Sequence, residues 1–358
     1  QMNTADNNTA VGYGALDANT SAFNNTAVGK DALGATSTGS SNTAVGASAL
    51  AVNTATANTA VGSAALRQNT TGTNNTAVGV NSLFVNVDGI NNTATGVGSL
   101  GGNTSGNNNT AVGINSMVTN STGNDNTAMG ASALDANTIG FNNVAIGVNS
   151  MGANTDGDNN TAVGTNALLS NTTGGGNTAI GTSALQMNTA SDNTAVGYGA
   201  LDANTTAANN TAVGRNALGT TSTGGSNTAV GTNALAANTA TANTAVGVGA
   251  LQANTIGTDN TAVGVNALLA NVDGINNTAT GVGSLGGNTS GDNNTAMGHN
   301  ALVANSSGNG NTATGVGALG GNTSGDNNTA VGINSMVANS TGDDNTAVGA
   351  SSLNANTI

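Results

Sequence analysis

Cysteine, proline, tryptophan and glutamate are absent from this 358-residue sequence, and aromatic residues make up only 1% of it. Without cysteine there is no disulfide and no thiolate metal site. Charged residues account for only 5% of the chain while apolar residues account for 37%, much of it alanine, a balance unlike that of a charge-swollen disordered chain. The composition therefore excludes a disulfide-stapled fold, and it fits neither an ordinary globular domain nor a disordered tail.

Positive charge is also scarce. Lys30, Arg67 and Arg215 stand against 16 Asp residues, which gives a net charge of -13. Such a chain has no cationic surface for nucleic acid or anionic lipid, and no run of 18 apolar residues predicts membrane insertion. We expect neither as a partner.

Acid–base chemistry has few candidates in this chain. His299 is the only histidine, it stands at a position that tolerates many side chains, and no glutamate accompanies it. The aspartates fall mostly where turns are expected, and the glycine-rich pattern of calcium-binding β-rolls is missing. We therefore predict no catalytic residue, no cofactor and no metal site.

What the sequence does contain is a repeat. The pentapeptide Asn8-Thr9-Ala10-Val11-Gly12 returns, with small variations, 21 times along the chain, in steps of 17 residues apart from three steps of 16. Numbered from its first Asn, the unit reads N-T-A-V-G-x-x-A-L-x-x-N-T-x-G-x-N. A fixed short period held throughout is typical of stacked units that bury themselves against their neighbours. The prediction is an all-β parallel β-solenoid of about 21 coils with a 17-residue repeat.

A longer repeat lies above the short one. The segment 1–5 recurs as 186–190, and 86–90 recurs as 271–275, so the two copies are offset by 185 residues, or 11 coils. We expect one continuous solenoid over residues 1–358, made of two blocks, 1–185 and 186–358. Both ends of the sequence fall inside a repeat, and we expect it to be a segment of a longer repeat protein.

The 21 copies show which positions tolerate change. Position 3 is always Ala, position 5 is always Gly, position 9 is always Leu or Met, and position 6 accepts Tyr13, Lys30 and His299. This predicts two short strands per coil, at positions 2–4 and 8–11, with a surface turn at positions 13–17, where the three short coils each lose a residue. Asn at positions 1 and 12 is expected to form amide ladders, and Thr at position 2 a further ladder.

The expected ladder and interior residues of the first two coils are therefore the conserved polar and apolar members of the repeat. They are Asn8, Thr9, Val11, Leu16, Asn19, Asn25, Val28 and Leu33.

Ala at position 3 and Val at position 4 cannot both point inward, because side chains alternate along a strand. If Val is inside, an invariant Ala forms an outer stripe that something close must keep small. If Ala is inside, the outer stripe is Val, Ile and Met, an exposed apolar patch. Either arrangement predicts a partner surface, most simply another copy of the chain. The interface candidates are Ala10, Ala27, Ala44 and Ala60.

Across nearly its whole length the repeat resembles those of bacterial and phage tail-fibre-like surface proteins. More distantly, Asn8-Thr9-Ala10-Val11-Gly12 is similar to the head repeats of trimeric autotransporter adhesins. That second resemblance implies three associated β-rolls, with Thr9 and Val11 pointing into the coil and Ala10 facing a neighbouring chain. The unit departs from that family in its 17-residue length and in the added Leu at position 9.

These features together suggest the structural shaft of an extracellular filament, fibre or surface adhesin that self-associates along an Ala/Val stripe. One alternative is a receptor-binding tail fibre whose residues at positions 6, 7 and 10 grip surface glycans, although only Tyr13, Tyr198, Phe23, Phe84 and Phe141 supply aromatic rings. A second alternative is an ice-binding solenoid. It requires Thr columns on one flat face, whereas Ala and Val usually follow each Thr in this sequence.

Overall fold

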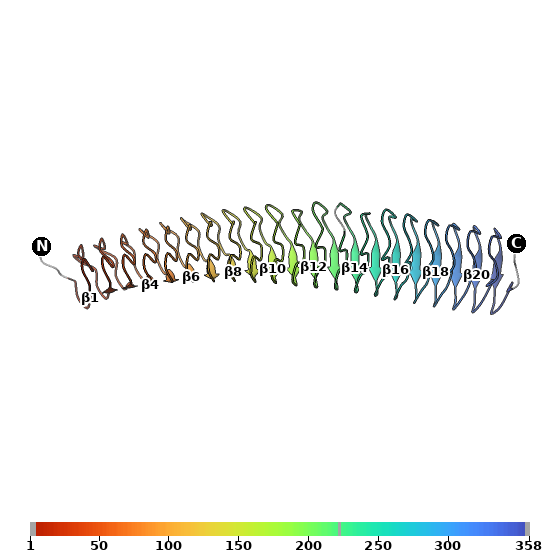
Figure 1. Ribbon diagram of the computed structural model, residues 1–358, viewed down its shortest axis with the longest axis horizontal. Helices are drawn as coiled ribbons and strands as arrows, with labels where there is room; N and C mark the ends of the chain where they lie inside the picture. Colours follow the sequence, from red (N-terminus) through yellow and green to blue (C-terminus); the bar gives the residue numbers. More distant parts are fainter. Residues whose placement is uncertain (1–4, 221–222, 355–358) are drawn as a thin grey trace. The chain divides into compact units, whose positions relative to one another are not determined.

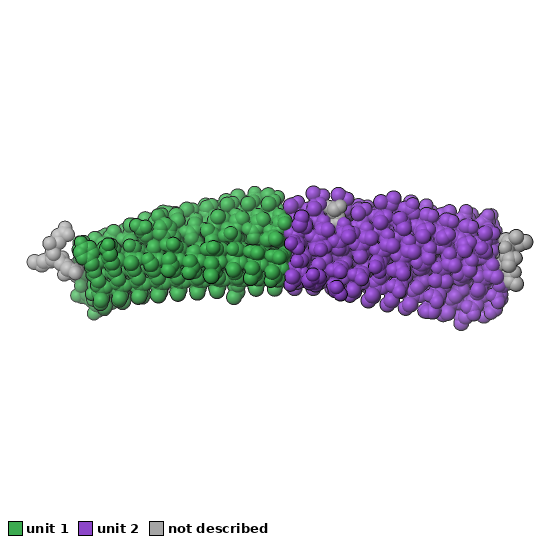
Figure 2. Space-filling view, in the orientation of Figure 1, with its two compact units in different colours: residues 1–177 green, residues 178–358 purple. Residues whose placement is uncertain are grey.

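The chain is an all-β protein whose strands are parallel and stacked as a β-solenoid, as the repeat predicts. The computed structural model describes residues 5–220 and 223–354. These residues contain short strands, turns and bends, and no helix. They belong to two compact units, 1–177 and 178–358 (Figure 2). The unit boundary thus precedes the predicted block boundary at 185 by 185 − 177 = 8 residues. The continuity of the solenoid between the two units stays a prediction.

Each coil contributes one three-residue strand (Figure 1). In the first unit the strands are β1 (Thr9–Val11), β2 (Thr26–Val28), β3 (Thr43–Val45), β4 (Thr59–Val61), β5 (Thr76–Val78), β6 (Thr93–Thr95), β7 (Thr110–Val112), β8 (Thr127–Met129), β9 (Val144–Ile146) and β10 (Thr161–Val163).

The second unit holds the remaining strands. They are β11 (Thr178–Ile180), β12 (Thr194–Val196), β13 (Thr211–Val213), β14 (Thr228–Val230), β15 (Thr244–Val246), β16 (Thr261–Val263), β17 (Thr278–Thr280), β18 (Thr295–Met297), β19 (Thr312–Thr314), β20 (Thr329–Val331) and β21 (Thr346–Val348).

Strand pairing within each unit keeps the repeat in register. In the first unit, Ala27 of β2 lies opposite Ala44 of β3, and each pairing of successive strands joins like positions in the same way. The same holds in the second unit, where Ala195 of β12 lies opposite Ala212 of β13. Identical positions of successive coils therefore form straight columns, and we name each column by its position in the repeat.

Column 3 lies inside the coil, and this corrects the assignment of Ala to an outer contact stripe. Ala27, Ala44 and Ala60 are fully buried within the single chain, while Ala10, in the first strand β1, is exposed. Because side chains alternate along a strand, an inward Ala turns positions 2 and 4 outward. Thr9, Val11 and Val28 were expected in the ladders or the interior, and they face outward instead.

The second predicted strand, at positions 8–11, is absent from every described coil. These residues form turns, because the Leu or Met of column 9 adopts a left-handed conformation, with φ of 49° at Leu33 and 57° at Met117. Column 9 is nevertheless the main apolar column of the core, since Leu33, Leu50 and their successors as far as Met336 are fully buried. β-branched residues fit this backbone region badly. The conformation explains why column 9 never contains Val or Ile.

Glycine in column 5 has an equally direct cause. Gly79 has φ of 136°, and a Cβ built there would lie 2.4 Å from the carbonyl oxygen of Gly96 in the next coil. Both the backbone conformation and the close approach of the next coil exclude any side chain. The chain turns out of its strand at this position.

Asparagine side chains form hydrogen bonds between successive coils, which confirms the predicted Asn ladder. In column 12, Asn86 donates from Nδ2 to Oδ1 of Asn69, the equivalent residue one coil earlier, at 2.7 Å. In column 1, Oδ1 of Asn75 accepts from the backbone N–H of Asn92, one coil later, at 2.9 Å. All four of these side chains are fully buried. Each column therefore links successive coils through the interior.

The two Asn columns also meet within a coil. The carbonyl oxygen of Gly89, at position 15, accepts from Nδ2 of Asn75 at 2.8 Å and from Nδ2 of Asn86 at 3.0 Å. In the short coil 42–57 the corresponding bond runs from Asn53 to Ala55, two residues on instead of three. The residue that short coils lose therefore lies between positions 12 and 15, within the predicted turn.

Replacing Leu100 tests the left-handed column. Leu100→Ile should lower the free energy of local opening by about 2 kcal/mol, because a β-branched side chain adds backbone strain to the packing change. Leu100→Met should cost less than about 1.5 kcal/mol, since Met already occupies this column elsewhere. The measurement is amide hydrogen exchange in residues 92–108. Val78→Ile is the matched control, because column 4 already holds Ile146. Equal effects of Ile and Met at position 100 would contradict this explanation.

Replacing Asn86 tests the buried ladder. Asn86→Asp should destabilise the coil by about 3 kcal/mol at neutral pH, because the carboxylate loses two donors and is buried against carbonyl oxygens. Burial raises the folded-state pKa of this carboxyl above its unfolded value, so the damage should lessen as the pH falls from the raised folded-state pKa to the unfolded value of about 4, and should change little below it.

The control for this change is Asn91→Asp, in exposed column 17, where the chain itself uses Asp125 and Asp344. Thermal unfolding should be almost unchanged in the control. A pH-independent loss of stability in Asn86→Asp would count against the ladder.

Candidate binding surfaces

The outward side of the strands forms a regular surface in each unit, which we call the Thr/Val face. It consists of columns 2 and 4, which flank the Ala of every strand, buried in all but β1. Column 4 remains partly open to solvent: Val45, Val78 and Ile146 in the first unit are 37%, 39% and 38% exposed. The second unit repeats this with Val213, Val230 and Val246. An apolar column therefore follows the sheet in both units.

The Thr/Val face is uncharged, since columns 2 and 4 contain only Thr, Val, Ile and Met. In the described coils the column 2 hydroxyls make no hydrogen bond to the protein, unlike those of column 13, where Thr70 donates to the carbonyl oxygen of Val87 at 2.9 Å. The expected Thr ladder at position 2 is thus replaced by hydroxyls that face solvent. Strands β6, β17 and β19 carry Thr at both outward positions.

A second surface runs along columns 7 and 10, which follow the Gly of column 5 in each coil. We call it the column 7/10 groove. In the first unit, Arg67 in column 10 lies over the ring of Phe84 in the next coil, 5.8 Å from its centroid. Phe84 in turn borders a depression of about 250 Å³ that includes Gly98 and Gly101. The groove deepens where glycine replaces a side chain.

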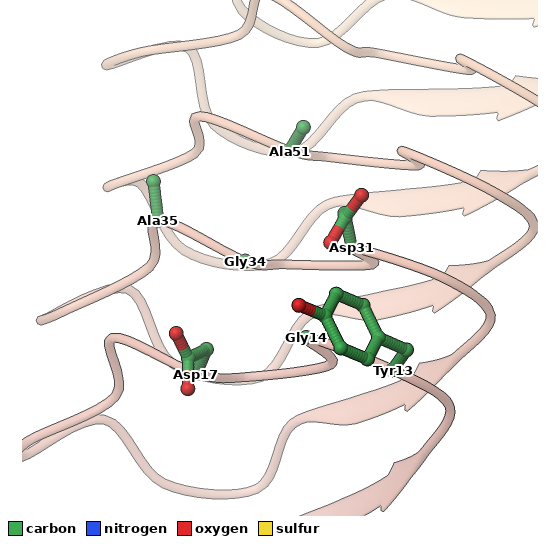
Figure 3. Close-up of a pocket in the computed structure, with 7 residues that line it drawn as sticks. All are labelled: Tyr13, Gly14, Asp17, Asp31, Gly34, Ala35 and Ala51. Atoms are coloured by element: carbon green, nitrogen blue, oxygen red, sulfur yellow. The ribbon is translucent and has the colours of Figure 1, made fainter.

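Another depression of this groove lies in the first three coils of the first unit. It measures about 500 Å³ and is bordered by Tyr13, Asp17, Asp31, Gly34 and neighbouring small residues. Figure 3 shows the Tyr13 ring lying across it, between Asp17 on the same coil and Asp31 on the next. Lys30 and Asp31 make a loose ion pair at 4.0 Å, with both side chains largely in solvent.

Asp135 and Asp202 of column 10 are partly buried, and this affects their carboxyl groups. Burial raises the pKa of Asp135 and of Asp202, while hydrogen bonds to backbone groups partly oppose the shift. A raised folded-state pKa means that ionising these groups weakens the fold slightly as the pH rises through the unfolded value. They are ordinary half-buried acids, and neither has a basic partner in the described structure.

The one histidine of the sequence lies at the surface. His299 is exposed in column 6. Within residues 5–220 and 223–354, no three His, Asp, Glu or Cys side chains gather closely enough to hold a metal ion. The same residues include no helix with the length and apolar character needed to cross a bilayer.

The comparisons with known proteins leave the chain without a family assignment. No protein-family model matches the sequence, and no curated protein gives a significant match.

The structure places the residues singled out from the sequence in three groups. Leu16 and Leu33 lie in the buried column 9. Asn8 and Asn25 belong to the column 1 ladder, where Oδ1 of Asn8 accepts from the N–H of Asn25 at 2.9 Å. Asn19, in column 12, exchanges hydrogen bonds with Ala22 of its own turn, and the next coil offers no amide to its Oδ1 because Thr36 occupies that column.

The sequence named positions 6, 7 and 10 as glycan contacts in the tail-fibre alternative, but it did not predict the depressions of the column 7/10 groove. One signal for them was present, because glycine interrupts columns 7 and 10 at Gly14 and Gly34, beside the rare Tyr13. Recognising this glycine signal required knowing that columns 7 and 10 border the same groove. The turn at positions 8–11 creates this arrangement, and a strand there had been expected.

Proposed function

We propose that this chain is the shaft of an extracellular filament, fibre or surface adhesin, in which copies associate along the Thr/Val face. The supporting observation is the apolar column 4, which stays partly exposed on an uncharged sheet surface in both units. Exposed apolar patches of this length are rare on proteins that act as monomers. The extracellular setting rests on the resemblance of the repeat to surface-protein repeats.

A mechanical role suits the way the coils are joined. Within each unit, successive coils bond to one another through strand backbone, turn backbone and the two buried amide columns, of which column 12 is interrupted where Thr replaces Asn. Stability is then shared among nearest-neighbour contacts along the array. Under this proposal the molecule acts as a spacer without catalysis or cofactor. The partner is a second copy, because the periodic face of one chain matches the period of another identical chain.

Charged substitutions on the Thr/Val face test the association. Val45→Lys, Val78→Lys and Ile146→Lys, combined, should turn associated wild-type protein into monomer, because three ammonium groups would have to be buried between the copies. Light scattering after size-exclusion chromatography, with electron microscopy of the same fractions, gives the measurement. Circular dichroism verifies that the solenoid survives.

The matched control changes three exposed aliphatic residues of the turn, Val87→Lys, Ile90→Lys and Ile139→Lys, and should still associate. Wild-type protein that stays monomeric at about 100 μM, a concentration high enough to reveal a weak micromolar contact, would refute the proposal. So would a face variant that associates as well as the wild type.

Ice binding is a second candidate. The Ala that follows each Thr of column 2 in the sequence counted against it, and in the structure this Ala points inward. Thr at position 2 and Val at position 4 lie on one outer face, and the inward Ala between them does not interrupt it. Rows of hydroxyl and methyl groups repeat at about 4.8 Å between coils, a spacing that can order water. Thermal hysteresis in the wild type that disappears in the face variant but not in the turn control would favour ice over a second copy. Wild-type protein without hysteresis excludes it.

A further inference from the structure

The column 7/10 groove carries the same depression at matching places in the two units. In the second unit it measures about 340 Å³ and is bordered by Asp202, Asn216, Gly219 and Thr220, with Asn233, Ala236 and Gln252 extending it into the next coils. Adding the 185-residue offset to Asp17, Asp31 and Gly34 gives Asp202, Asn216 and Gly219. Each unit therefore carries its own version of one pocket.

Glycine creates the hollow in both versions. Column 10 carries large side chains such as Phe84 and Leu169 in some coils and glycine in others, and at Gly34 and Gly219 the absence of a side chain leaves the space of the two depressions empty. The backbone does not demand glycine there, since neither Gly34 nor Gly219 has a left-handed φ. Glycine at these two positions therefore provides open space that the backbone conformation does not itself require.

The two pockets share hydrogen-bonding chemistry. Asp17 and Asp202 each supply a carboxylate on one side, and Asp31 or Asn216 supplies an acceptor oxygen on the next coil. Replacing Asp31 by Asn216 keeps the acceptor and removes the charge. A ligand recognised through its hydroxyl groups suits both pockets, while a ligand recognised through a positive charge suits only the first.

An aromatic ring completes the first pocket. Tyr13 is 82% exposed and borders the hollow, as Figure 3 shows. Tyr198 holds the equivalent position in the second unit and is 59% exposed, although it does not border the hollow there. These are the only two tyrosines of the chain. Such a ring offers an apolar face to the C–H groups of a sugar ring.

We propose that the two pockets bind hexopyranose residues of an uncharged glycan. The carboxylates and the amide oxygen accept hydrogen bonds from sugar hydroxyls, and Tyr13 packs against one face of the sugar in the first pocket. Volumes of about 500 and 340 Å³ suit small-molecule sites. This inference goes beyond the shaft function and does not depend on the Thr/Val face, which is made by different columns.

Saturation-transfer NMR on the full chain tests the sugar sites. The probes are methyl α-mannopyranoside, methyl β-glucopyranoside and methyl β-galactopyranoside, each at about 20 mM, so that a millimolar site is mostly occupied. At least one should receive saturation from the wild type. The double variant Gly34→Leu and Gly219→Leu, which fills both hollows with the side chain found at Leu169, should reduce that signal about tenfold. Tyr13→Ala alone should reduce it partially.

The matched control is Gly152→Leu, because it adds the same side chain to column 10 away from both hollows. It should keep the wild-type signal, and circular dichroism should show all variants folded. Three outcomes would overturn the proposal: no transfer to any of the three glycosides, an unchanged signal in the filled double variant, or at least tenfold tighter binding of protonated glucosamine than of methyl β-glucopyranoside.

Discussion

The buried asparagine amides are the constraint on which the rest of the molecule depends. A coil of 17 residues with one three-residue strand has too little apolar surface to offset the entropy of ordering it. Asn75 and Asn86 both bond to Gly89 within a coil, and their columns bond to the coils on either side. Polar groups that would be costly to bury unpaired thus become the connection between neighbours. The one-coil spacing between these bonds fixes the register of every other column.

That spacing explains both the narrow interior and the open exterior. With the centre occupied by Asn, Leu and the Ala or Ser of column 8, only Ala is found at the inward strand position. The larger Val and Thr side chains of the strand are consequently outside. The same geometry places columns 7 and 10 beside each other across a left-handed turn. A thin core therefore yields two surfaces in each unit, one apolar and regular, the other variable and locally hollow.

The 17-residue period, together with the repeat positions that accept different residues, was enough to predict the architecture, the Asn ladder and the surface turn. Each of these follows from which columns vary. Which strand side chains face the core was harder to predict. Ala27 and Val28 are both apolar, and the alternation of side chains allows either Ala or Val to point inward. The resemblance to adhesin heads selected the wrong phase. The second strand was also wrong. Leu33 and its equivalents looked like strand residues, and only the lack of Val and Ile in column 9 indicated the left-handed turn.

Thiol accessibility gives the most direct test of the inward-Ala coil, because the natural sequence has no cysteine. Ala77→Cys and Val78→Cys place single thiols at neighbouring positions of β5, the first buried and the second facing out. In dilute, unassociated protein, the thiol at position 78 should react with a soluble disulfide reagent at nearly the unfolded rate. The thiol at position 77 should be protected about a hundredfold or more, since it reacts only on local opening. Fast reaction at position 77 with protection at position 78 would contradict the account.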